Sequence, residues 1–178
     1  MKSYTLHLFI LLTSLGIAQE KENSEEPFKP HHSIGLMLGH THLREGEIDG
    51  NKKWLAVPSI GLDYNYVFSE KWSIGLHNDM VIENFKVEDE DNEIIERSRP
   101  IASILTGGYK PGKHFTFQAG LGGEFAKEEN LFVTRLGVEY SVELPDEWEF
   151  LVNVVYDNKW GTYDSFCLGI GVAKKFGK

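Results

Sequence analysis

The chain has 178 residues, a formal net charge of -9 at pH 7 and a mean hydropathy of -0.30. The length suits one domain, the acidity argues against nucleic-acid binding, which needs a basic surface, and the low hydropathy argues against membrane-spanning helices. Cys167 is the only cysteine, so the fold must close without an internal disulfide.

The N-terminus carries the features of an export signal. Lys2 gives a positive start, residues 6–15 form an apolar run too short to cross a bilayer as a helix, and residues 16–18 (GIA) form a small-x-small cleavage site. We therefore predict a signal peptide over residues 1–18; the alternative is a buried N-terminal helix. Residues 19–32 are charged and lack apolar periodicity, which predicts a disordered periplasmic lead-in.

Beyond this lead-in, apolar and polar residues alternate along the chain. Within residues 60–64, for example, Ile60, Leu62 and Tyr64 share one face, and Gly61 and Asp63 share the other. Period two is the pattern of a β-strand, whose side chains point to opposite faces in turn. Eight such segments are predicted, at about residues 33–42, 54–68, 72–86, 99–109, 115–125, 132–143, 148–157 and 165–176.

Short and longer connections join these segments alternately. The short ones are SEK, KPGK and LPDE, and the generally longer ones are REGEIDGNKK, VEDEDNEIIERS, AKEEN and DNKWGT. Short turns at one end and longer loops at the other are typical of membrane barrels, whose turns face the periplasm. The predicted fold is therefore all-β, an eight-stranded antiparallel up-and-down transmembrane β-barrel over residues 33–178.

Aromatic residues gather at the two ends of the predicted strands. Rings with a polar edge favour both interfaces of a bilayer, so two aromatic girdles are predicted. The girdle at the short-turn end comprises Phe68, Trp72, Tyr109, Phe115, Trp148 and Phe176. The girdle at the loop end comprises Trp54, Phe125, Phe132, Tyr156, Trp160 and Tyr163.

The signal segment, the eight alternating strands and the ending VAKKFG with Phe176 resemble the small outer-membrane β-barrel proteins of Gram-negative bacteria, the OmpA/OmpX-like class. The resemblance covers about residues 33–176, although such barrels often end on the aromatic residue itself. It implies a location in the outer membrane, in contact with membrane lipid and lipopolysaccharide, after insertion by the barrel-assembly machinery. It implies location far more than activity, because the class includes adhesins, membrane-stabilising proteins, small-molecule conduits and a few lipid-modifying enzymes.

The polar strand faces would line the interior of this barrel. An eight-stranded barrel is only wide enough for side chains to fill it, so these groups are expected to pair as a structural plug. Arg135 is expected to pair with Glu139, Glu124 or a cross-strand carboxylate. The predicted lumen network comprises Asp63, His77, Asp79, Glu83, Glu124, Arg135, Glu139, Glu143 and Glu149. The alternative is a narrow conduit for protons, cations or small molecules along the acidic lumen.

The acidic connection at residues 87–98 is expected to be a solvated loop. Its functional alternative is contact with an extracellular partner, or divalent-cation bridging to lipopolysaccharide with Arg97 and Arg99 as direct phosphate contacts. The favoured role of the protein is accordingly structural or surface interaction.

The sequence leaves three further possibilities open: a metal site, a lipid-modifying enzyme and a soluble binding protein. His40 and His42 are spaced to share a metal ion, but no third ligand accompanies them, so neither a metal nor a cofactor is expected. His77 and Asp79 share a strand face without an assignable serine, so no catalytic residue is assigned and a lipid-modifying enzyme remains an alternative. A soluble lipocalin-like binder would need the apolar face to point inward.

Overall fold

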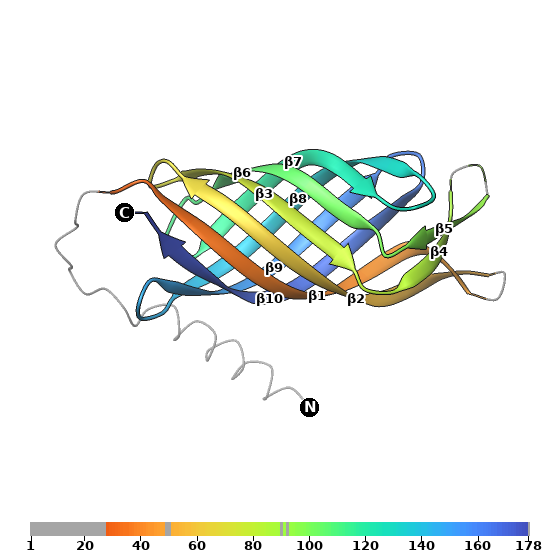
Figure 1. Ribbon diagram of the computed structural model, residues 1–178, viewed down its shortest axis with the longest axis horizontal. Helices are drawn as coiled ribbons and strands as arrows, with labels where there is room; N and C mark the ends of the chain where they lie inside the picture. Colours follow the sequence, from red (N-terminus) through yellow and green to blue (C-terminus); the bar gives the residue numbers. More distant parts are fainter. Residues whose placement is uncertain (1–27, 49–50, 90, 92, 178) are drawn as a thin grey trace, which may run out of the picture.

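The computed structural model describes residues 28–177 except 49, 50, 90 and 92. Ten β-strands form one antiparallel sheet (Figure 1). They are β1 (His31–Ile48), β2 (Asn51–Val67), β3 (Trp72–Val81), β4 (Asn84–Glu88), β5 (Ile94–Ser98), β6 (Ile101–Tyr109), β7 (Phe115–Phe125), β8 (Asn130–Glu143), β9 (Trp148–Lys159) and β10 (Tyr163–Phe176). The predicted signal peptide and residues 19–27 of the predicted lead-in lie outside the described part. His31 and His32, predicted as the end of the lead-in, belong to β1, so the strand begins two residues earlier than predicted.

Eight of these strands close into a barrel, as the alternation predicts. Each pairs with its neighbour in the order β10-β9-β8-β7-β6-β3-β2-β1, and β1 pairs again with β10. A row of paired residues that leaves β10 at Phe166 passes once around the wall and returns to β10 at Phe176, ten residues further along. This stagger requires the strands to tilt by roughly 40° from the barrel axis.

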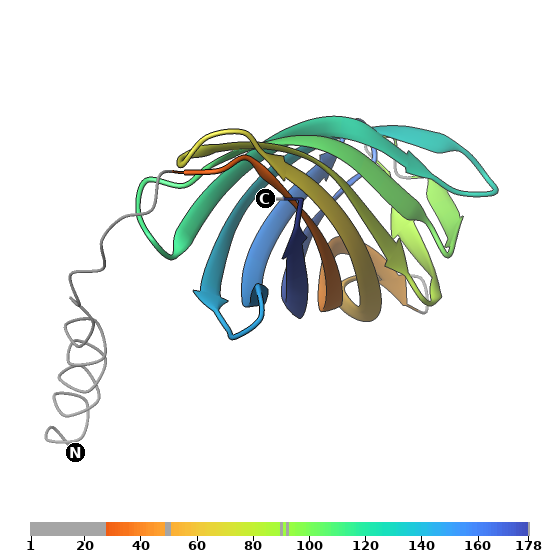
Figure 2. The same ribbon diagram turned by 60° about the vertical axis from the view of Figure 1, so that its left-hand side comes forward.

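The two ends of the barrel differ. The segments 68–71, 110–114 and 144–147 reverse the chain at one end, which we call the turn end, and the last described residues of β10 lie there too (Figures 1 and 2). At the opposite end, which we call the loop end, β1 and β2 continue past the wall as a hairpin, and β4 and β5 form a second hairpin beside it. In the part of the chain that the structure describes, no helix is long and apolar enough to cross a membrane.

Two of the connections predicted as loops are therefore strands. The β1–β2 pairing crosses an irregularity between Leu43 and Gly46 and runs on to Ile48 and Asn51. The segment expected as a solvated loop at 87–98 lies largely within the β4–β5 hairpin, which joins β1 through the pair Gly46–Val87. The β4–β5 hairpin keeps a period of two, although its charge resembles that of a loop. It forms because its inward residues Phe85 and Val87 pack in an apolar layer.

The apolar strand faces point outward and the polar faces point inward. Leu38, Leu121 and Leu136 expose 61%, 58% and 61% of their surface on the outer wall, whereas Thr106, Gln118 and Ser165 are buried inside. This is the arrangement of a barrel with an apolar surround, and it is the reverse of what a soluble lipocalin-like binder requires.

The interior changes character along the axis. At the loop end, inward side chains from β1, β2, β4, β8 and β10 form an apolar layer of Leu43, Val57, Phe85, Val87, Leu131 and Tyr163. The rest of the interior is mostly polar and charged. It also contains two small apolar clusters, one of Ala102, Ile104 and Val133 and one of Met37, Leu151 and Ala173. The apolar layer therefore caps the polar lumen, and β4 and β5 hold its position over the opening.

Candidate functional site

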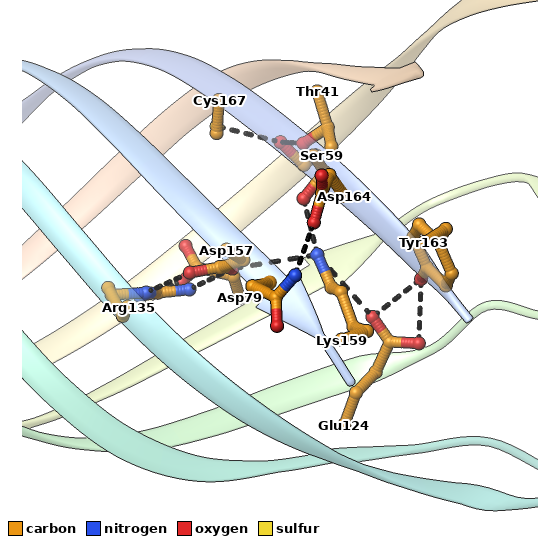
Figure 3. Close-up of polar contacts among 12 residues, drawn as sticks. Thr41, Ser59, Asp79, Glu124, Arg135, Asp157, Lys159, Tyr163, Asp164 and Cys167 are labelled. Atoms are coloured by element: carbon orange, nitrogen blue, oxygen red, sulfur yellow. Dashed lines mark hydrogen bonds and ion pairs between the residues drawn. The ribbon is translucent and has the colours of Figure 1, made fainter. Parts of the chain in front are cut away.

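The central ion cluster of the lumen is built on Arg135 of β8. Its Nε and Nη2 atoms donate to the two carboxylate oxygens of Asp157 at 2.7 and 2.8 Å, and Nη1 donates to Oδ2 of Asp79 at 2.6 Å (Figure 3). Asp157 is the residue paired with Arg135 on the adjacent strand β9, whereas Asp79 lies across the lumen on β3. The fork of the guanidinium thus ties two parts of the wall together through charge-assisted bonds.

A second ion pair links the loop-end hairpin to the barrel wall. Arg97 of β5 is fully buried, and its Nε and Nη2 atoms donate to Oε1 of Glu124 at 3.1 and 2.6 Å. Its Nη1 atom donates to the carbonyl oxygen of Glu129 at 2.9 Å. The hydroxyl of Tyr163 lies 2.7 Å from both carboxylate oxygens of Glu124. One carboxylate from β7 therefore joins the hairpin to β10 across the barrel.

Lys159 connects these two pairs into a continuous network. Its Nζ atom lies 3.9 Å from Glu124 and 3.7 Å from Asp157 (Figure 3). It also donates a hydrogen bond to the hydroxyl of Ser165. The loop-half cluster, as we call it, thus contains three cations and three carboxylates: Arg97, Arg135 and Lys159 with Asp79, Glu124 and Asp157. The balance of charge explains how so many ions can be buried together.

Asp63 lies beside this cluster without a counterion of its own. Its Oδ1 atom is buried without a hydrogen-bond partner and lies 3.9 Å from Nδ1 of His77. The Nε2 atom of His77 is 3.0 Å from Oδ1 of Asn65, an acceptor, so Nε2 carries the hydrogen and Nδ1 of a neutral ring is also an acceptor. The adjacent cavity, lined by Asp63, His77, Asp79 and Arg135 among others, has a volume of about 40 Å³.

A separate ion cluster lies at the turn end. The Nζ atom of Lys175 lies 2.8 Å from Glu143 and 3.1 Å from Glu149, and Lys110 lies 4.0 Å from Glu149 and donates to Ser141 at 3.1 Å. Glu139 lies between the two clusters on the inward face of β8, half-buried beside Thr116 and Asn153 on the neighbouring strands.

Several predicted positions differ in the structure. Glu83, predicted in the lumen, is exposed in the segment between β3 and β4, because β3 ends at Val81 and the alternation is interrupted there. Arg97, expected to contact phosphate at the surface, is buried in the loop-half cluster. Tyr163, expected in the loop-end girdle, points inward and bonds Glu124, because β10 starts two residues before the predicted segment.

The other predicted girdle residues lie on the outer wall. Tyr156 is half-buried, with its ring centroid 4.9 Å from that of Phe166. The remaining ones are exposed, namely Trp54, Phe68, Trp72, Tyr109, Phe115, Phe125, Phe132, Trp148, Trp160 and Phe176.

The two histidines considered as metal ligands also lie on the outer wall. The ring centroids of His40 and His42 are 5.7 Å apart. Within the described residues, no group of three or more His, Cys, Asp or Glu side chains is arranged to hold a metal ion. His77 contacts Asn65 and Asp63 rather than a serine, so the arrangement expected of an acyl-transfer site is not formed around it.

Lys159, Tyr163 and Arg97 are lumen residues that were not predicted from the sequence. Lys159 and Tyr163 continue the inward alternation of β9 and β10 by one step beyond the predicted ends of these strands. The burial of Arg97 could have been predicted from the alternation of residues 94–98, which puts Ile95 and Arg97 on the same strand face.

The fold is similar to that of small outer-membrane β-barrels of known structure. The attachment invasion locus protein Ail of Yersinia pestis, solved in complex with the heparin analogue sucrose octasulfate, superposes with a TM-score of 0.56 at 13% identity. Neisserial surface protein A (NspA) superposes with a TM-score of 0.53 at 8% identity. Each alignment covers 84% of this chain and the whole of the other chain. A scan against protein-family models and a search of curated proteins found no match. The similarity therefore concerns the fold.

Proposed function

We propose that this protein is a closed barrel of the bacterial outer membrane that acts through the surface at its loop end. The observation that carries the membrane location is the outer wall, where large apolar side chains are exposed on every barrel strand. Burial of one such side chain is worth about 1.5–3 kcal/mol, so a continuous wall of them is stable only in an apolar surround. The signal predicted at residues 1–18 would export the chain, and the barrel-assembly machinery would insert it.

The filled lumen supports a structural rather than a conducting barrel. A cavity of about 40 Å³ has room for about three water molecules. The bonds from Arg135 to Asp79 and from Tyr163 to Glu124 cross the lumen, and the apolar layer, to which Tyr163 belongs, closes the loop end. An ion would have to displace both the charged network and the apolar layer in order to pass.

The acidic charge of the β4–β5 hairpin at the loop end indicates what kind of partner would bind there. Residues 84–98 contain six acidic and two basic residues, and one of the two, Arg97, is buried. A partner with a cationic surface fits this hairpin. The sucrose octasulfate bound in the Ail complex is an anion, whereas this hairpin favours a cation, so we expect this protein to differ from Ail in its ligands.

Reconstitution in lipid tests the closed barrel. The purified protein should float with phospholipid vesicles and should show no unitary current steps in planar bilayers at 100 mV. Recovery in the soluble fraction without detergent would overturn the membrane location. Reproducible current steps would instead support the second candidate function, a narrow cation conduit. That function is favoured by the Oδ1 atom of Asp63, which is buried without a hydrogen-bond partner beside the lumen cavity.

The surface role needs its own measurement. Vesicle-bound protein should retain poly-lysine and not heparin, and the variant Glu88→Gln/Glu93→Gln/Glu96→Gln should lose most of this retention. The control Glu70→Gln/Asp146→Asn at the turn end should keep it. Equal retention by the hairpin variant and the wild type would refute the assignment to the hairpin.

A further inference from the structure

An apolar groove crosses the outer wall of the barrel. It has a volume of about 520 Å³ and is lined by residues of β3, β6, β7, β8, β9 and β10. Gly107 and Ala119, paired neighbours on β6 and β7, form part of its lining. A Cβ atom added at Gly107 would have only the carbonyl oxygen of Ala119 within 4 Å, at 3.9 Å. The groove is therefore a depression left by two small side chains in a wall of large ones.

Pairs of aromatic rings mark the two ends of the groove. At one end the ring centroids of Trp72 and Tyr109 are 4.8 Å apart, and at the other those of Tyr156 and Phe166 are 4.9 Å apart. Trp72 is the first residue of β3, directly after a turn, so the first pair lies at the turn end. Phe166 lies in the loop-end half of β10.

The course of the groove matches one leaflet of a bilayer. It follows the paired rows across six strands, a distance of roughly 24 Å at about 4.8 Å per strand. These rows run perpendicular to strands that tilt by about 40°, so the groove rises by roughly 15 Å along the barrel axis. Half of a hydrocarbon core of about 30 Å has this thickness. An acyl chain that starts at the turn-end interface would therefore fit along the groove.

Exposed lysine residues lie on the two turns beside the turn end of the groove. The turns 68–71 and 110–114 lie side by side, since the amide of Lys110 donates to the carbonyl oxygen of Lys71 at 2.8 Å. Together they carry Lys71, Lys110 and Lys113 against one acidic residue, Glu70, in a chain of net charge -9. Lys71 and Lys113 are exposed, whereas Lys110 is turned toward Ser141 in the lumen. Charge complementarity thus favours an anionic headgroup beside these two turns.

We propose that this groove binds one anionic phospholipid of the periplasmic leaflet, with an acyl chain over Gly107 and Ala119 and its phosphate beside Lys71 and Lys113. The proposal rests on the membrane location proposed above and is independent of whether the lumen conducts. Lysines near a membrane surface attract anionic lipid, and the small residues provide the space that a mobile chain would fill.

Native mass spectrometry on protein released from vesicles tests this site. The vesicles contain equal amounts of phosphatidylglycerol and phosphatidylcholine, and heat-modifiable mobility on gels first confirms that every variant is folded and inserted. The wild type should retain one phosphatidylglycerol. Gly107→Leu/Ala119→Leu should lower this occupancy roughly ten-fold by filling the groove. Ala56→Leu, which adds a leucine at another exposed position of the wall, should leave the occupancy unchanged.

The headgroup is tested separately. Lys71→Gln and Lys113→Gln should each lower the preference for phosphatidylglycerol about five-fold, whereas Lys86→Gln/Lys127→Gln at the loop end should not. The proposal is overturned if the wild type retains no phospholipid, if the groove-filling variant retains as much as the wild type, or if phosphatidylcholine is retained equally well. A dimer that dissociates only in the groove-filling variant would show that a second copy occupies the groove, and would also overturn it. Failure to insert into vesicles would refute the membrane location itself.

Discussion

Removal of the Arg97 side chain should strongly destabilise the barrel. Arg97 is fully buried, makes two hydrogen bonds to Glu124 and one to the carbonyl oxygen of Glu129, and belongs to a hairpin outside the barrel wall. In Arg97→Met the carboxylate of Glu124 would stay buried without its closest cation. Breaking a buried pair in this way typically costs about 3–5 kcal/mol.

The contacts that Glu124 retains favour a destabilisation at the lower end of this range. Glu124 keeps the hydroxyl of Tyr163 at 2.7 Å and the ammonium of Lys159 at 3.9 Å, so part of its charge remains compensated. We expect Arg97→Met to lower the free energy of unfolding by about 3 kcal/mol, or roughly a hundred-fold in the equilibrium constant. Arg97→Met/Glu124→Gln should recover part of this loss, because the uncompensated charge is removed.

Equilibrium unfolding in urea, followed by tryptophan fluorescence in phospholipid vesicles, measures these values. Lys86→Met serves as the control, since Lys86 is an exposed cation on the neighbouring strand β4. It should change the free energy of unfolding by less than about 0.5 kcal/mol. A loss below about 1 kcal/mol for Arg97→Met, or no recovery in the double variant, would refute the view that this ion pair holds the hairpin onto the barrel.

Three further predictions concern the turns, the wall and the loop end. Glu147 has a φ of 62°, so Glu147→Gly should raise the free energy of unfolding by roughly 1 kcal/mol; an unchanged or lower urea midpoint would contradict this. Gly122→Ala should cost about 1–3 kcal/mol, because its Cβ atom would collide with the main chain of β6, whereas Gly112→Ala, with open space around it, should be neutral in the same assay. The hydrogen bond from the Ser98 hydroxyl, at 2.6 Å, lowers the pKa of Glu128 below its ordinary value of 4.5. Since the folded pKa is the lower one, this contact stabilises the loop above about pH 4.5 and is lost as the pH falls through the folded pKa. The Ser98 amide donates to Glu128 at 3.2 Å. Its protection factor, which compares the exchange rate with the intrinsic rate at the same pH, should therefore fall in acid, and a pH-independent protection factor would contradict this.

The sequence by itself determined the barrel wall. The alternation along β7, for instance, assigns Phe117 and Leu121 to the outside and Gln118 and Glu124 to the inside, because a strand turns successive side chains to opposite faces whatever it pairs with. Turn residues such as those in KPGK located the reversals for a similarly local reason. These features depend on neighbours a few residues apart, which the sequence states directly.

Tertiary structure alone decided which charges meet. Arg135 bonds Asp157 and Asp79 rather than Glu139, because the strand register and the stagger of the closed barrel bring β8, β9 and β3 to the same level. Arg97 is buried because its hairpin folds back against β1 over the opening. Partners across a lumen are set by closure of the whole sheet, and no local period carries that information.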